Sequence, residues 1–220
     1  MHFCLLTSGG CGKNSGVMAR ILLAGIGPLP SEAQKQLFAP GLRASIFAQT
    51  LHEAGHEVSV ALGQFGELEK TGLTLRHWPP EADPAEVHAA SLNEAFKLVL
   101  AQVKPDVVVA TTDVMARAAV ESGTDVPLWV DFYGSPMAER QQQAFVHAHD
   151  GGIAAAWRMI LPALLRADAF SVCSNYQRLA LIGELGTCGR LNQFTAGQEL
   201  VHVIPPGNAF AELLPCKPSL

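Results

Sequence analysis

Short apolar runs alternate with amphipathic stretches along most of this chain. The apolar runs are typical of strands that are buried on both faces, and they lie at 20–26, 57–62, 73–77, 106–110, 127–130, 170–173 and 201–204. Between them, apolar residues recur at helical spacing, which predicts helices at 42–54, 85–103, 114–121, 137–148, 153–166 and 176–185. The helical spacing is most regular in the second of these segments, and Lys104-Pro105 ends it.

This alternation predicts the fold class. Successive strand–helix–strand units form parallel sheets with right-handed crossovers, so we predict a doubly wound, mainly parallel α/β sheet in a single domain. Such sheets bind ligands at the carboxyl ends of their strands. The candidate positions for a site are therefore those that follow the strands, at 25–43, 63–70, 111–113, 131–139 and 174–176.

Composition narrows the class of protein. Of the 220 residues, 49% are hydrophobic and 16% are charged, and the net charge is −5. The low charge content excludes an intrinsically disordered chain, and the negative balance predicts no nucleic-acid partner. The apolar runs are too short to span a bilayer, so we expect no membrane association. The five cysteines are scattered and form no CxxC pair, which is typical of reduced thiols in a cytoplasmic protein.

Two glycine-rich segments match nucleotide-binding motifs only in part. Residues 8–15 lack the first glycine and the final Ser or Thr of a P-loop, and a strand rather than a helix is predicted after them. Gly25, Gly27 and Pro28 begin a dinucleotide-binding pattern, but Pro30 stands where its third glycine belongs. We therefore expect no tightly bound cofactor.

The loop after the first predicted strand is long, and it ends where the first helix begins, at Gly41, Leu42 and Arg43. Long loops inside compact domains are often functional. A glycine at a helix start lets a ligand approach the exposed backbone amides there, which suits a phosphate or a sugar oxygen. The alternative is that Gly41 only shapes a turn.

Acidic residues follow two other predicted strands. Asp131 comes after an apolar strand, Tyr133 and Gly134 lie in the turn beyond it, and Glu139 lies on the next helix. Two carboxylates at such a place can bind sugar hydroxyls, or one can act as a base. The alternative is that Asp131 caps a loop and Glu139 is solvated. Asp113 follows another strand, where it is either a polar site residue or the N-cap of the next helix.

The histidines give no sign of a metal centre. His147 and His149 are two residues apart on a predicted helix, so they point to different faces, and no other ligand cluster supports them. We predict no metal site.

Six phrases of the sequence, taken in order, resemble one enzyme family. They are RILLAGIGPLP at 20–30, APGLRASIFAQTLHEAGHEVSVAL at 39–62, KPDVVVATT at 104–112, PLWVDFYGSPMAE at 127–139, ADAFSVCSNYQRLALIGELG at 167–186 and VHVIPPG at 201–207. Together they resemble the N-terminal, acceptor-side domain of GT-B glycosyltransferases of the family 4 type. The resemblance implies a Rossmann-like domain at 18–207, an extension at 1–17, and a tail at 208–220 where a second domain would begin.

The resemblance also implies a reaction and a site. Enzymes of this family transfer a sugar from a nucleotide-sugar to an acceptor in a cleft between two domains, usually without a metal. Residues 131–134 lie where many relatives keep an active-site histidine; this chain has none there, and Asp131 is the predicted catalytic base. The predicted acceptor- and phosphate-binding residues are Gly25, Gly27, Pro28, Gly41, Arg43, Asp113, Tyr133, Gly134 and Glu139.

The family's donor-binding half carries a Glu-x7-Glu signature, and none follows Gly207 in this sequence. We therefore expect the chain to need a donor-binding domain as its partner, and to have little or no activity without one. Its acceptor would be a small molecule or a glycan. Two alternatives stay open. One is a non-catalytic sugar-binding module that pairs as a homodimer, and the other is a small α/β oxidoreductase that binds a nucleotide cofactor.

Overall fold

The computed structural model describes residues 17–30, 38–64, 72–80 and 83–206. Nearly all of the predicted extension, the whole of the predicted tail and the P-loop-like segment at 8–15 lie outside these residues. So do residues 31–37 and 65–70, which belong to two of the candidate loops. The predicted domain boundaries therefore stay predictions.

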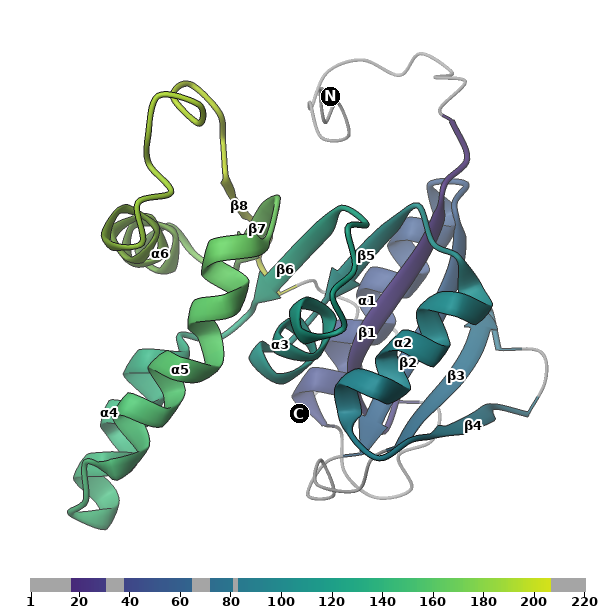
Figure 1. The fold of residues 1–220 in the computed structure, drawn as a ribbon, viewed down its shortest axis with the longest axis horizontal. Helices are drawn as coiled ribbons and strands as arrows, with labels where there is room; N and C mark the ends of the chain where they lie inside the picture. Colours follow the sequence, from purple (N-terminus) through teal and green to yellow (C-terminus); the bar gives the residue numbers. More distant parts are fainter. Residues whose placement is uncertain (1–16, 31–37, 65–71, 81–82, 207–220) are drawn as a thin grey trace, which may run out of the picture.

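One eight-stranded sheet crosses the molecule in the order β4-β3-β2-β1-β5-β6-β7-β8 (Figure 1). The strands are β1 (Arg20–Gly27), β2 (Glu57–Gln64), β3 (Gly72–Trp78), β4 (Ala85–His88), β5 (Val107–Ala110), β6 (Leu128–Phe132), β7 (Ala169–Val172) and β8 (Val201–Val203). All neighbouring strands from β2 across to β8 pair in parallel. At the other edge, β3 is antiparallel to β2, and β4 is antiparallel to β3. The predicted Rossmann-like, mainly parallel α/β sheet in a single domain is thus confirmed.

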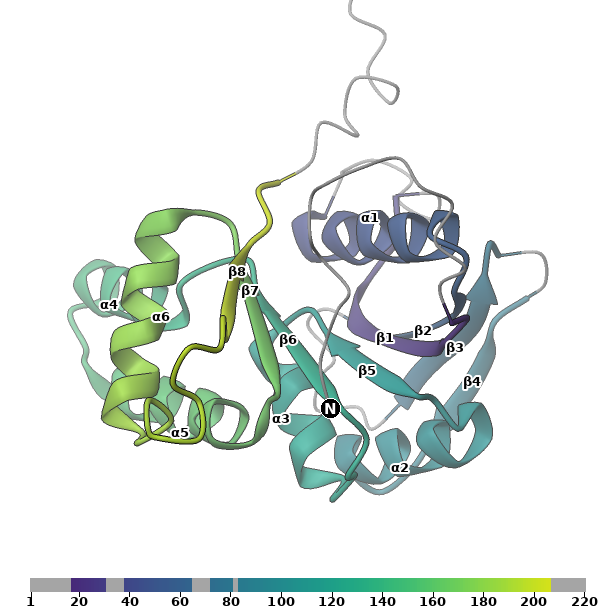
Figure 2. The same ribbon diagram turned by 90° about the horizontal axis from the view of Figure 1, so that it is seen from above.

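The helices cover both faces of the sheet. They are α1 (Ala39–Glu53), α2 (Leu92–Val103), α3 (Asp113–Glu121), α4 (Pro136–His147), α5 (Gly151–Arg166) and α6 (Asn175–Thr187). Seen from above, α1 lies on one side of the sheet and α2 and α3 lie on the other (Figure 2). Helices α4 and α5 pack against each other as a hairpin. None of the helices within the described residues is long and apolar enough to cross a bilayer.

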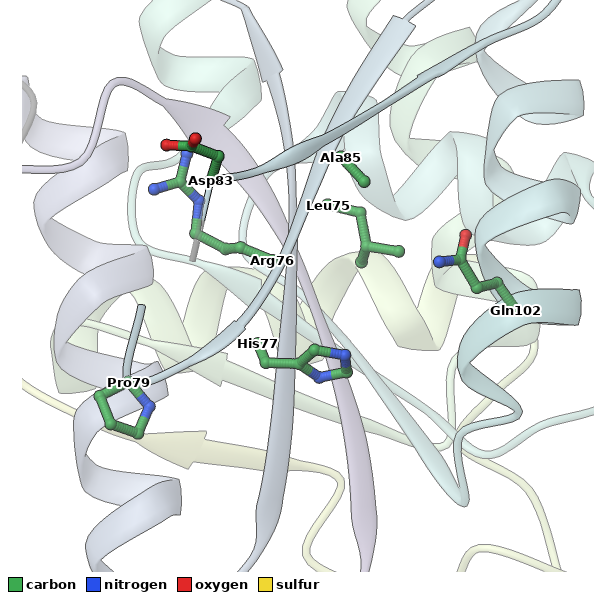
Figure 3. A pocket seen from close by; sticks show the side chains of 7 residues that line it. All are labelled: Leu75, Arg76, His77, Pro79, Asp83, Ala85 and Gln102. Atoms are coloured by element: carbon green, nitrogen blue, oxygen red, sulfur yellow. The ribbon is translucent and has the colours of Figure 1, made fainter. Parts of the chain in front are cut away.

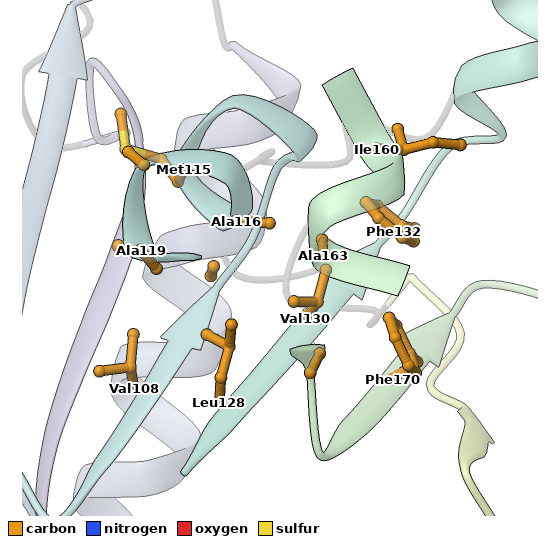
Figure 4. Packing of buried hydrophobic residues seen from close by; sticks show 14 of the residues in the cluster. Val108, Met115, Ala116, Ala119, Leu128, Val130, Phe132, Ile160, Ala163 and Phe170 are labelled. Carbon is orange, nitrogen blue, oxygen red and sulfur yellow. The ribbon is translucent and has the colours of Figure 1, made fainter. Parts of the chain in front are cut away.

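The core divides into two clusters, one on each face. On the α1 side, Ala44 and Phe47 pack against strand residues such as Leu23 and Val60. The larger cluster on the opposite side joins β5, β6 and β7 to α3 and α5, and Figure 4 shows α3 and α5 over these strands. Both faces of the central strands are therefore buried, as their continuous apolar sequences predict.

The segment 85–103, predicted as one helix, consists of two elements. Its first residues form β4, where Val87 pairs with Leu73 of β3. Helix α2 begins only after Ser91, whose hydroxyl accepts a hydrogen bond from the Glu94 amide at 3.4 Å. The prediction was wrong at this point because the regular helical spacing begins only at Leu92, whereas the residues before Ser91 pair with β3.

The predicted alternation of strands and helices is also interrupted between β2 and β3, which follow each other in the chain without a described helix between them. A parallel crossover needs about a dozen residues or more. The stretch between Gln64 and Gly72 is shorter, and β3 runs antiparallel to β2. The sheet therefore carries an antiparallel pair at one edge, outside the doubly wound part.

The order of the strands fixes where a ligand can approach. The chain runs from β1 to β2 on one side and later returns to β5 on the other side of β1. The segments that follow β1 and β5 diverge at this switch point, which is the usual ligand site of such sheets. Gly25 of β1 lets Thr111 and helix α1 approach the strand closely. A Cβ on Gly25 would lie 2.8 Å from Thr111 Oγ1 and 3.0 Å from Ala44 Cβ.

Candidate functional site at the carboxyl edge of the sheet

We use the term carboxyl edge for the residues that follow β1, β5, β6 and β7 at one end of the sheet, at 28–30, 111–113, 133–139 and 173–177. Helices α3, α4 and α6 begin here. Thr112 caps α3 by accepting from the Met115 amide at 3.2 Å, and Ser174 caps α6 by accepting from the Gln177 amide at 3.3 Å. The positive ends of these helix dipoles therefore meet at the carboxyl edge.

Asp131 lies inside β6, because this strand continues beyond the predicted end to Phe132. Its side chain is fully buried, and both carboxylate oxygens accept hydrogen bonds from Arg43, at 2.9 Å from Nε and 2.8 Å from Nη2. Ser171 Oγ donates to the same carboxylate at 2.5 Å, and Trp129 Nε1 donates to Ser171 Oγ at 2.9 Å. The catalytic role predicted for Asp131 stays a prediction, and this closed geometry does not favour it.

Arg43 was predicted to bind an acceptor or a phosphate, but its guanidinium faces the protein. It is 5% exposed and lies 4.7 Å from the centre of the Phe47 ring. Burial lowers the pKa of Arg43, but the hydrogen bond and the charge of Asp131 outweigh this effect and raise the pKa overall. Arg43 also donates to the backbone carbonyls of Ile204 and Pro205, at 3.0 and 3.2 Å.

The space beside Gly41 is filled by the protein itself. A Cβ on Gly41 would overlap the carbonyl oxygen of Pro28 and lie 2.8 Å from its carbonyl carbon. The glycine at this position therefore allows a close approach of two backbone segments, a role that the sequence does not indicate, and the geometry does not favour a ligand beside Gly41. Gly27 has ordinary space around it, with Leu62 as its nearest neighbour at 3.5 Å, and Pro28 is exposed.

Three of the predicted site residues at the carboxyl edge have side chains that are at least partly exposed: Asp113, Tyr133 and Glu139. We call them the Tyr133 group. Glu139 is exposed in the first turn of α4, and its carboxylate lies against Gly134, where any Cβ would overlap it. Asp113 is partly exposed, and it accepts from the Val114 amide at 2.9 Å. The N-cap of α3 is Thr112, so the N-cap reading of Asp113 was wrong by one residue.

The Tyr133 side chain is half-buried. Burial raises its pKa to about 12, and the charges of Glu139, Asp113 and Asp131 add to the effect. The phenol is therefore a hydrogen-bond donor at neutral pH. Its backbone is held by Gln177, whose amide nitrogen donates to the Tyr133 carbonyl at 3.5 Å and whose amide oxygen accepts from the Cys173 amide at 2.8 Å.

No sequence pattern marks Gln177, Ser171 or Trp129 as residues of this site. Gln177 lies one residue beyond the candidate window at 174–176, in the first turn of α6. Ser171 and Trp129 lie inside apolar strands, where no local pattern marks a hydrogen-bonding role. Their contacts join β6 to β7.

The cysteine at the carboxyl edge is not activated. Burial raises the pKa of Cys173, and the nearby charge of Arg43 only partly offsets this effect. Within the described residues there is also no group of three or more His, Cys, Asp or Glu side chains that could hold a metal ion.

Cavities add little to this site. A space of about 10 Å³ near Gly134, Gln177 and Glu184 is only large enough for a water molecule or one hydroxyl group. A larger cavity of about 280 Å³ lies at the antiparallel edge of the sheet (Figure 3). Its lining residues are Leu75, Arg76, His77, Pro79, Asp83, Ala85 and Gln102, and they include none of the predicted site residues.

The ionisation of Tyr133 is directly measurable. The absorbance of tyrosinate at 295 nm should show a step near pH 12, and Tyr133→Phe should remove it. Because the folded protein holds this proton up to about pH 12 while an unfolded tyrosine loses it near 10, stability should fall as the pH rises between these values. The Tyr176→Phe variant is the control, since that side chain is 88% exposed. A single step near pH 10 in the folded protein would contradict this geometry.

Comparison of the chain with protein-family models and with curated proteins found no match.

Proposed function

We propose that this domain binds the acceptor in a sugar-transfer reaction, and that a second domain or chain holds the nucleotide-sugar donor. The single observation that carries the proposal is the Tyr133 group at the switch-point end of the sheet. The ordered sequence phrases that resemble GT-B glycosyltransferases support it independently.

The chemistry of the Tyr133 group suits a sugar. Each sugar hydroxyl is both a donor and an acceptor, so it pairs well with a set that contains both kinds of partner. Tyr133 supplies a phenol O–H that stays protonated at neutral pH, while Asp113 and Glu139 supply carboxylate oxygens.

Within this proposal, Glu139 is better placed than Asp131 to take a proton. Glu139 is exposed at the carboxyl edge, whereas Asp131 is enclosed by Arg43 and Ser171. When the acceptor oxygen bonds to the anomeric carbon, the bond from that carbon to the donor phosphate breaks. The hydroxyl proton then passes to the Glu139 carboxylate, and the nucleoside diphosphate leaves with the bonding electron pair.

A binding measurement tests the proposal. Monosaccharides and methyl glycosides should give saturation-transfer difference signals in NMR with the purified chain. For a sugar that gives such a signal, Glu139→Gln should weaken the affinity roughly tenfold, because the substitution removes a charged hydrogen-bond acceptor. The matched control is Glu94→Gln, because Glu94 is likewise an exposed acidic residue in the first turn of a helix.

The outcomes separate the candidate functions. Sugar binding that is lost in Glu139→Gln but kept in Glu94→Gln supports the proposal. If no sugar in the panel binds, or if the two variants weaken binding equally, the proposal is wrong. Sugar binding together with no transfer from nucleotide-sugars, even with added donor-binding domains of related enzymes, would favour the non-catalytic binding module.

A further inference from the structure

The chain leaves β8 through Ile204 and Pro205, and Arg43 donates a hydrogen bond to the backbone carbonyl of each. We infer that Arg43 is a positioning residue that locks this exit segment, residues 204–205, to the carboxyl edge of the sheet. The inference does not rest on the proposed function, because it concerns the direction of the chain and holds for any ligand at this edge.

The guanidinium makes two pairs of contacts at once. One pair holds Asp131 in β6, at 2.9 and 2.8 Å, and the other holds the exit segment, at 3.0 and 3.2 Å. Arg43 itself belongs to α1, so it joins three segments that are far apart in the sequence. A planar guanidinium has five donors in a fixed arrangement, and binding both partners therefore fixes their relative orientation.

The partners of Arg43 are themselves held in place. Asp131 is fixed from the β7 side by Ser171, and the Ile204 amide donates to the Val172 carbonyl of β7 at 2.8 Å. On the α1 side, the Phe47 ring lies under the guanidinium and 5.2 Å from the Trp129 ring. Helix α1, strands β6 and β7 and the exit segment thus form one continuous set of contacts.

This arrangement couples the exit segment to the Tyr133 group. Asp131 precedes Tyr133 by two residues, so a shift of the exit segment must break the bonds of Arg43 to one of its two partners or move the end of β6. Buried ion pairs contribute little net stability compared with apolar replacements, and their best-documented use is to specify one arrangement. Here the arrangement that Arg43 specifies is the path of residues 204–205.

Amide hydrogen exchange in Arg43→Lys tests this role. Lysine keeps the charge and can pair with Asp131, but its single ammonium group cannot hold the carboxylate and both carbonyls together. We expect the Ile204 amide to exchange roughly tenfold faster than in the wild type, because its local opening becomes easier. The Leu23 amide in the central strand should keep its rate. The control is Arg20→Lys, which changes the exposed Arg20–Asp106 pair, whose atoms are 3.2 Å apart.

Two further variants keep the test decisive. Ser171→Ala removes a hydrogen bond of Asp131 but none of the exit segment. The Ile204 amide should therefore exchange at about its wild-type rate in this variant, as the Leu23 amide should. If Arg43→Lys does not fold, the double variant Arg43→Met/Asp131→Leu replaces the buried pair by apolar side chains and should show the same selective loss at Ile204. An unchanged Ile204 rate, or equal acceleration of Ile204 and Leu23, would overturn the inference.

Discussion

Gly41→Ala is expected to lower the free energy of unfolding by about 3 kcal/mol, at the upper end of the range for overpacking. The new Cβ would overlap the Pro28 carbonyl oxygen, and that atom belongs to the backbone. Relief therefore requires α1 and the end of β1 to move apart, whereas a flexible side chain could simply turn away. Urea denaturation, followed by circular dichroism, measures the change.

The control for this prediction is Gly183→Ala. Gly183 lies in α6 and has no neighbouring atom within 4 Å of an added Cβ. The same substitution should there raise the stability by up to about 1 kcal/mol, because alanine favours a helix interior more than glycine does. The two variants should thus change stability in opposite directions. A stabilising effect in both would show that Pro28 does not pack against Gly41 as described.

Asp131→Ala is expected to cost about 3 kcal/mol of stability, since it leaves the buried guanidinium of Arg43 without its counter-charge. The carbonyls of Ile204 and Pro205 still accept from Arg43, which keeps the loss at the lower end of the range for a broken buried pair. The double variant Asp131→Leu/Arg43→Met should recover most of the loss, because it removes both charges together. The free energies of unfolding of the single and double variants give the measurement.

An exposed pair of the same type serves as the reference. Arg20 and Asp106 join β1 to the start of β5, and both side chains are about half exposed. Asp106→Ala should leave the stability nearly unchanged, because solvent screens such pairs. If Asp131→Ala is as harmless as Asp106→Ala, the buried network does not hold the carboxyl edge together.

The sequence was sufficient to predict the strands that are buried on both faces. The runs at β1, β2 and β7 are mostly apolar, and their predicted ends fall within two residues of those observed. Prediction failed at β4, because this strand lies at the sheet edge and is mostly exposed. A strand of that kind has no continuous apolar run, and the neighbouring α2 residues extended the helical pattern into it.

The site was predictable only where its parts are close in the sequence. Tyr133, Gly134 and Glu139 follow one strand, and the structure brings them together. Asp131 was also picked out, but its partner Arg43 is 88 residues away, so its enclosure could not be inferred from its neighbours. The same holds for Gly41, because only the folded chain shows that the Pro28 carbonyl fills the space beside it.

The two outer strands of the sheet limit how this protein can assemble with others. An open strand edge invites a further strand, and proteins suppress this with short or charged edge strands. Strand β4 is short and carries Glu86, which accepts from Thr74 Oγ1 at 3.0 Å. Strand β8 is also short, and Arg178 Nε donates to its Val201 carbonyl at 3.0 Å. Neither edge is suited to strand addition, so the partner that the proposed function requires would have to dock on helices or at the carboxyl edge.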